Sequence, residues 1–257
     1  MHKIFGLLLC GLHITAGQAV GQGKAASIVA PSQAAVRFDQ TTVRSVLNQK
    51  IPAEIQLPAG KLVEAKKWTD ANGQNLLFVV RTPERPEPLS AEGMEAGRRA
   101  ELYVRQYTSR NSRYQELWRL QDAVENCIVD ITLATLPGST TITDLDNDGH
   151  TETTILYRLA CRGDVSPANL KLIMREGKAK YALRGEMIQL LNHGTKEEQK
   201  RAANKPLCCA DGVKPTDDYS QLEGLYQNEK EFATAPPAFL AYARQQWRRW
   251  RASDRFE

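Results

Sequence analysis

The sequence predicts a mainly antiparallel β domain that is rich in hairpins and ends in an amphipathic helix, with α+β as the alternative label. β-Branched and aromatic residues recur at a spacing near two between about residues 60 and 190. Only near the C-terminus do apolar residues recur at spacings of three and four. The 257 residues are 42% hydrophobic and 25% charged. This composition is typical of a globular protein and excludes a disordered, collagen-like or polytopic membrane chain.

The N-terminus has the organisation of a secretory signal peptide. A short basic start precedes an apolar run over residues 4–16, and small residues around Ala19 offer a cleavage site. The run is shorter than the roughly 20 residues of a spanning helix. We therefore expect residues 1–19 to be removed, no transmembrane span to remain, and the protein to be periplasmic or secreted. Residues 20–58 lack an apolar period and are predicted to form a flexible leader or linker.

Residues 59–257 are predicted to form a single β-rich domain. Asn72-Gly73 separates two β-prone segments, residues 61–68 and 75–81, which is a strong hairpin signal. Three prolines and many charges predict an exposed loop over residues 82–97. The other strands are expected at residues 100–107, 114–124, 127–136, 140–143, 151–161, 170–175 and 180–184.

Two helices are expected after the last strand. The first is a short one at residues 196–203, and the second is the C-terminal helix at residues 237–252. Helical spacing places the apolar side chains of the second on one face: Phe239, Leu240, Ala243, Trp247 and Trp250. Its arginines, namely Arg244, Arg248, Arg249 and Arg251, are expected mainly elsewhere. We expect this helix to pack on the sheet; a membrane-surface helix is the alternative.

An acidic stretch at residues 144–152 carries the clearest chemical pattern. Alternating aspartates supply hard oxygens, and Gly149 allows a sharp turn between them. An EF-hand would need an acid at its twelfth position, where this chain has Ile155, so we expect a loop inside a β-hairpin instead. The predicted ligands of a structural calcium ion are Asp144, Asp146, Asp148, the carbonyl of His150, and Glu152. The alternative is an acidic, solvated turn.

The cysteines predict disulfides. Removal of the signal peptide leaves Cys127, Cys161, Cys208 and Cys209, an even number in an exported chain. The acidic loop lies midway between the first two, so strands pairing around it would bring Cys127 and Cys161 face to face. Four cysteines allow three connectivities, however, and the sequence does not choose among them. A zinc site is not expected because no CxxC spacing occurs.

Signatures of enzymes are absent from the sequence: it has no nucleophile elbow, HExxH, P-loop or dinucleotide-binding glycine pattern. A catalytic pair of converging carboxylates, as glycosidases use, stays an alternative, although the sequence does not indicate which two acids would form it. The net charge of +4 is too small to indicate a nucleic-acid partner. The tripeptide Arg162-Gly163-Asp164 is interpreted as chance, with Asp164 and Ser166 expected to form a capped turn before Pro167.

Two resemblances add to these observations. The acidic stretch resembles the calcium loops of integrin-type FG-GAP β proteins. More widely, several segments resemble a family of uncharacterised exported bacterial proteins, some labelled as surface-polysaccharide biosynthesis proteins. These segments are residues 65–70, 100–103, 127–130, 143–149, 164–167, 174–178 and 237–247, with Gly73, Asn75, Tyr181, Arg184 and Gly185. Local departures from the family pattern are the Arg-Gly before Asp164 and the Cys208-Cys209 pair.

The family resemblance implies a role in the cell envelope. The expected protein is a monomeric, non-enzymatic binding or accessory protein that carries a structural calcium loop and contacts envelope polysaccharide or protein. The alternatives are an envelope glycan hydrolase or transferase using carboxylates, and a calcium-braced adhesion module. A cleft with two acids outside the loop would favour the enzyme, and an exposed aromatic patch around Trp68 or Tyr103 would favour binding.

Overall fold

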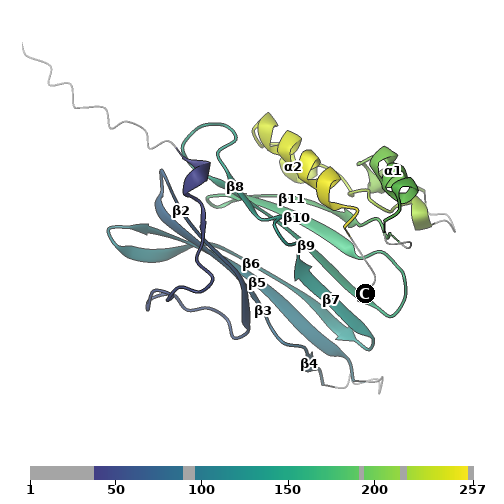
Figure 1. The fold of residues 1–257 in the computed structure, drawn as a ribbon, viewed down its shortest axis with the longest axis horizontal. Helices are drawn as coiled ribbons and strands as arrows, with labels where there is room; N and C mark the ends of the chain where they lie inside the picture. Colours follow the sequence, from purple (N-terminus) through teal and green to yellow (C-terminus); the bar gives the residue numbers. More distant parts are fainter. Residues whose placement is uncertain (1–37, 89–95, 191–193, 215–218, 254–257) are drawn as a thin grey trace, which may run out of the picture. The chain divides into compact units, whose positions relative to one another are not determined.

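The computed structural model describes residues 38–88, 96–190, 194–214 and 219–253. The chain divides into two compact units, Met1–Ala34 and Ala35–Glu257. The first unit, which holds the predicted signal peptide, lies outside the described residues, as does the leader up to residue 37. In the second unit the predicted fold class is confirmed: two antiparallel sheets are accompanied by two α-helices (Figure 1).

The first sheet is built on the predicted hairpin. Its strands are β1 (Arg44–Ser45), β2 (Lys61–Asp70), β3 (Gly73–Arg81), β4 (Arg85–Pro86), β5 (Arg98–Arg110) and β6 (Arg113–Cys127). β2 and β3 meet at the pair Asp70 and Gly73, where Gly73 has a φ of 110°. β3 pairs with one side of β5, and β6 pairs with the other. Among the described strands β6 pairs only with β5, so it forms an edge.

The second sheet contains the remaining strands, in the order β11-β10-β9-β7, with β8 also paired to β9. They are β7 (Asp130–Thr135), β8 (Thr141–Thr143), β9 (Glu152–Arg162), β10 (Asn169–Glu176) and β11 (Ala179–Glu186). The expected single strand over residues 127–136 is wrong. Cys127 ends β6 in the first sheet and Asp130 begins β7 in the second. The chain passes between the sheets here, so one continuous strand cannot form.

The main hydrophobic core lies between the two sheets. Leu77, Val79 and Leu102 of the first sheet pack with Ile155 and Ile173 of the second, and each is at most 3% exposed. Because side chains alternate along a strand, the even-numbered residues of β10 face the opposite side of the second sheet. All but the last of these even-numbered residues are apolar and buried, so another part of the chain must pack on this face of the second sheet.

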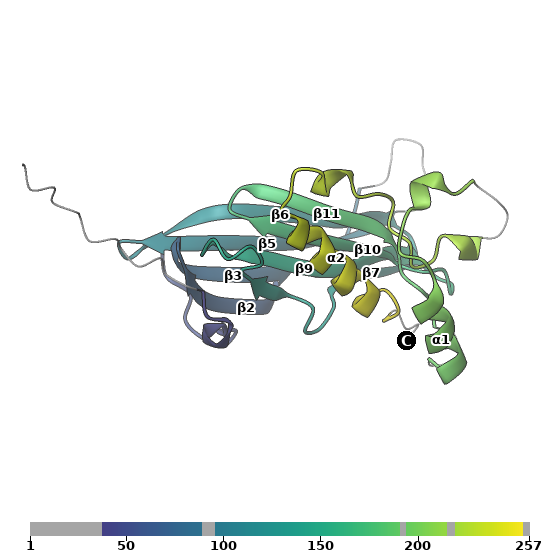
Figure 2. The ribbon, with the colours of Figure 1, turned by 90° about the horizontal axis from the view of Figure 1, so that it is seen from above.

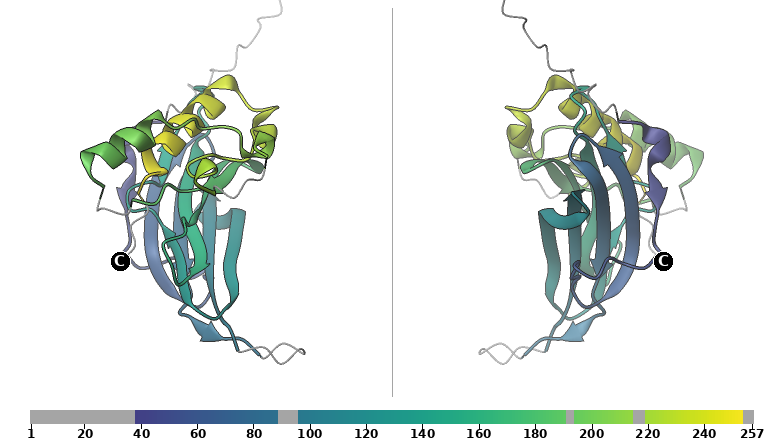
Figure 3. Two further views of the ribbon diagram at one scale, coloured as in Figure 1. Left: turned by 90° about the vertical axis from the view of Figure 1, so that its right-hand side faces the viewer. Right: turned by 90° about the vertical axis from the view of Figure 1, so that its left-hand side faces the viewer.

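The element that packs on this face is α2 (Pro237–Trp250), as the amphipathic pattern predicted. Phe239, Ala243 and Trp247 are fully buried against Leu172 and Met174 of β10. Figure 2 shows α2 lying across the second sheet, and in both views of Figure 3 the green and yellow helical segments lie together above the strands. α1 (Lys196–Asn204) begins with a capping box between Thr195 and Glu198. Short 3-10 turns complete the helical structure: η1 (Gln40–Thr42), η2 (Ala210–Gly212), η3 (Tyr219–Gln221) and η4 (Lys230–Phe232).

Arg251 is an exception to the expectation that the arginines near α2 lie away from the core. It is 1% exposed, and its guanidinium donates to the carbonyls of Ala202 at 2.8 Å, Lys205 at 2.7 Å and Gly224 at 3.1 Å. It follows the last residue of α2, where the chain turns back toward the end of α1. Backbone carbonyl oxygens replace the water that this guanidinium would otherwise bind.

The boundary placed at residue 59 is also corrected. Val46 and Ile55, from the expected leader, are 8% and 7% exposed and pack with Leu76, Phe78 and Tyr107. The amide of Val46 donates to the carbonyl of Ala65 at 3.0 Å, beside the β1–β2 pairing. Residues 38–58 therefore cover the outer face of the first sheet. No helix among the described residues is long and apolar enough to cross a membrane.

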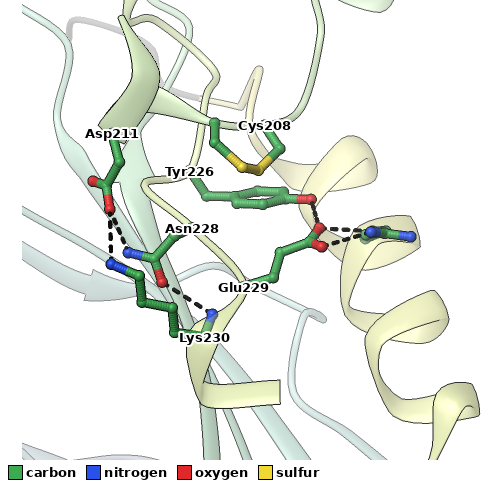
Figure 4. Close-up of a disulfide and its surroundings, with 8 residues drawn as sticks. Cys208, Asp211, Tyr226, Asn228, Glu229 and Lys230 are labelled. Atoms are coloured by element: carbon green, nitrogen blue, oxygen red, sulfur yellow. Dashed lines mark hydrogen bonds and ion pairs between the residues drawn. A yellow bond between two sulfur atoms is a disulfide. The ribbon is translucent and has the colours of Figure 1, made fainter. Parts of the chain in front are cut away.

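The described residues contain two disulfides. Cys127 and Cys161, which the expected strand pairing would bring face to face, have Cα atoms 5.5 Å apart and join β6 of the first sheet to β9 of the second. Cys208 and Cys209 bond to each other. Figure 4 shows the ring of Tyr226 beside this vicinal disulfide, with its hydroxyl donating to Glu229. The vicinal disulfide thus lies next to a buried tyrosine in the segment that covers the second sheet.

Candidate metal site

The acidic loop connects β8 to β9, inside a hairpin as expected. Thr143 and Glu152 are the last paired residues before the loop. Within it, Asn147 and Gly149 have φ values of 60° and 86°. These left-handed conformations are favourable for Gly and tolerated by Asn. They reverse the chain so that several aspartates come close together.

Buried hydrogen bonds hold the loop against the first sheet. The hydroxyl of Thr151 donates to Asp70 at 2.6 Å, and the indole N–H of Trp68 donates to the same hydroxyl at 2.8 Å. The amide of Ala71 donates to the carbonyl of Gly149 at 2.8 Å. Trp68 is only 1% exposed, so the suggested aromatic patch does not include it. Its indole instead fixes one end of the acidic loop.

The structure brings the predicted carboxylates together in two groups that share one residue. Asp144, Asp146 and Glu152 form one group, and Asp146, Asp148 and Glu176 form the other. In each group the possible ligand oxygens lie within 4.8 Å of one another. Asp146 belongs to both groups and is the centre of the arrangement. The imidazole of His150 is in neither group; its predicted role used only the backbone carbonyl.

Glu176 is the member that the sequence did not indicate. It is the last residue of β10, and the β9–β10 register pairs it with Glu152. The turn at Gly177 marks the end of this strand, but only the pairing with β9 places the Glu176 carboxylate beside the loop. The site therefore combines one loop with an acid from a neighbouring strand.

Burial and like charge disfavour ionisation of the two glutamates. Burial raises the pKa of Glu152 to about 8, while hydrogen bonds from Thr143 and Leu145 oppose this rise and Asp146 adds to it. The pKa of Glu176 is raised by burial and by the nearby Asp146 and Asp148 carboxylates. Crowded acids share this behaviour because ionising each one makes it harder to ionise the next.

Protein donors satisfy only part of the acceptor capacity of these carboxylates. The oxygens of Glu152 accept from the Thr143 hydroxyl at 2.8 Å and the Leu145 amide at 3.0 Å. By contrast, one buried oxygen of Asp144 and one of Glu176 have no hydrogen-bond partner among the described residues. Unpaired buried acceptors are unfavourable, whereas a hard cation would use them as ligands.

Three surface cavities bear on the enzymatic alternative. One of about 410 Å³ between the sheets includes Glu64, one of about 330 Å³ includes Asp122, and one of about 80 Å³ has no acid in its lining. None of these three, all lined by described residues, holds the two carboxylates that a glycosidase-type mechanism needs. They give no support to a glycan hydrolase that uses such a pair.

Comparisons with protein-family models, with curated proteins and with solved structures found no match. The family resemblance and the resemblance to FG-GAP calcium loops therefore stay hypotheses.

Proposed function

We propose that this protein is an exported binding or accessory protein of the cell envelope whose β-sandwich is braced by a calcium ion. Calcium binding is supported by the two clusters of three acids that have Asp146 in common. Calcium takes six to eight oxygen ligands in flexible geometry, and carboxylates from one loop and one strand suit that demand. The ion would neutralise acids that otherwise repel one another.

The role proposed for the ion is structural. Its ligands come from the β8–β9 loop and the end of β10, and the loop is tied through Thr151 and Asp70 to the first sheet. An ion bound here would hold the hairpin and the adjoining strand in one arrangement. Because the unfolded chain lacks this arrangement, binding would stabilise the fold by mass action.

The envelope part of the proposal rests on the signal-peptide pattern and on the family resemblance. The partner is proposed to be envelope polysaccharide or protein. An oxidising compartment agrees with the Cys127–Cys161 disulfide, because such bonds persist outside the cytoplasm.

Calcium binding is testable by thermal unfolding and calorimetric titration of the metal-free protein. We expect calcium to raise the melting temperature and magnesium to raise it much less, because magnesium dehydrates reluctantly. Asp146→Asn should abolish the calcium response, and Glu176→Gln should weaken it. Asp130→Asn, which removes an exposed acid from the start of β7, is the matched control and should leave the response intact. Equal melting curves with calcium and with chelator would refute the proposal.

A further inference from the structure

The cavity of about 330 Å³ lies where the edge strand β6 faces the inner side of the second sheet. Lys171, Ile173 and Arg175 of β10 alternate toward this inner side, as do Lys180 and Arg184 of β11. Further along the sheet the same side is apolar and packs in the core, as Ile155 does. Beside β6 this side of the sheet is cationic. The volume of the cavity there lies in the range of small-molecule sites, about 300–1,000 Å³.

The lining of this cavity is strongly unbalanced in charge. Five cations and one carboxylate contribute to it: Arg119, Lys171, Arg175, Lys180, Arg184 and Asp122. Asp122 is already occupied, because Lys171 lies 2.5 Å from it and the hydroxyl of buried Tyr157 donates to it at 2.7 Å. Outside the lining, Glu231 is shared between Lys180 and Arg184, and Glu116 pairs with Arg119. These three acids are thus fewer than the four lining cations with which they form ion pairs.

Arg175 is the cation that lacks an acidic partner. None of the described carboxylates lies within 4.0 Å of its guanidinium, which donates to the backbone carbonyls of Lys178 and Arg119, each at 3.2 Å. Its carbon Cζ lies 5.5 Å from the centre of the Trp118 ring, and its buried Nε has no hydrogen-bond partner among the described residues. Burial lowers the pKa of Arg175, because the charged guanidinium is partly removed from water. A nearby anion would offset this unfavourable free energy of desolvation.

Protection of the sheet edge accounts for part of this charge. Inward-pointing charges next to an edge strand discourage pairing with another chain, and the exposed Arg119 and Lys180 suit that role. Arg175 does not suit it, because its guanidinium is packed on Trp118 and oriented by two carbonyls. The larger cavity between the sheets shows the contrast: its charged lining is Glu64 and Arg81, one of each sign.

We infer that the cavity between β6 and the β10–β11 hairpin binds the anionic group of a sugar-sized molecule. Arg175 would be the central contact, and Arg184 and Lys180 would contribute further charge. The group is a carboxylate or a phosphate ester, because planar guanidinium donors recognise both. The inference does not depend on the calcium proposal, since none of the residues lining the cavity belongs to the two carboxylate groups.

Calorimetric titration of the full mature protein with three probes tests this inference. Glucose is the neutral reference, glucuronate carries a carboxylate, and glucose 6-phosphate carries a phosphate ester. We expect saturable binding of at least one anionic probe and none of glucose, and the preferred probe identifies the anion. Arg175→Gln should weaken that binding about tenfold, as loss of a charged hydrogen bond does.

The control is Lys61→Gln, which removes one positive charge from the exposed start of β2 and leaves the cavity lining unchanged. It should alter the affinity less than about twofold if the cavity, rather than the general charge, binds the probe. If Arg175→Gln lowers the melting temperature strongly, Arg184→Gln gives the same readout. The inference is overturned if neither anion binds better than glucose, or if Lys61→Gln weakens binding as much as the cavity variants do.

Discussion

At the scale of single residues, Glu152 shows how burial in the fold disfavours ionisation of a carboxyl group. The side chain is fully buried, held by two donors of its own hairpin and close to the Asp146 carboxylate. Its pKa of about 8 in the folded protein, against an ordinary 4.5, means that folding favours the protonated form. A bound cation would favour the ionised form instead.

The stability of the calcium-free protein should therefore fall as the pH rises from about 4.5 to about 8. In this window the folded state keeps a proton on Glu152 that the unfolded chain has released, so stability decreases until the folded state also ionises. Glu152→Gln should flatten this dependence, and Glu54→Gln, an exposed acid, should not. Urea unfolding at several pH values measures the slope. An unchanged slope in Glu152→Gln would show that another group causes it.

A second residue-scale feature was predictable because it is local. Asp164 accepts from the amide of Ser166 at 3.0 Å, which is the capped turn expected from their spacing. The role of Arg251 was not predictable. Its acceptors belong to residues 202, 205 and 224, far along the chain, and helical spacing alone placed it away from the core.

At the scale of elements, the hairpins followed from turn chemistry and the crossing between sheets did not. Gly73 and Gly177 mark their turns because both have positive φ values, which few other residues accept. By contrast, the β-branched residues after Cys127 resemble one continuous strand. A change of sheet leaves no strong local signal, and here the Cys127–Cys161 disulfide joins the two sheets beside it.

Removal of this disulfide should destabilise the domain by about 2–4 kcal/mol, because the bond closes a long loop and restricts the unfolded chain. The cysteines are separated by 34 positions. The double variant Cys127→Ser/Cys161→Ser tests this in urea unfolding. Cys208→Ser/Cys209→Ser is the control: a bond between adjacent residues closes almost no loop and should contribute much less. Equal losses in the two variants would contradict the loop-closure argument.

At the scale of the whole described unit, each sheet is covered on both faces. The first sheet packs on the second and on residues 38–58, and the second sheet also packs beneath α2. The composition of residues 38–58 is typical of a linker, but Val46 and Ile55 are sufficient to anchor it on Leu76 and Phe78. Two buried side chains in a polar segment do not produce a period that the sequence alone reveals.

A chain that begins at residue 59 should accordingly be less stable than one that begins at residue 38. Burial of a large aliphatic side chain contributes about 1.5–3 kcal/mol, so losing Val46 and Ile55 should cost at least about 3 kcal/mol. Chemical unfolding of the two truncated chains measures the difference. Equal stabilities would restore the interpretation of residues 38–58 as a linker.

The fold class, the main hairpins, the amphipathic face of α2 and the candidate loop could be predicted from the sequence, because each is encoded by residues close together in the chain. Three features depend on the three-dimensional fold: which strands share a sheet, the place of Glu176 among the acidic groups, and the gathering of cations beside β6. These features arise from register and from the packing of one sheet on the other. Such long-range contacts have no period or spacing in the sequence.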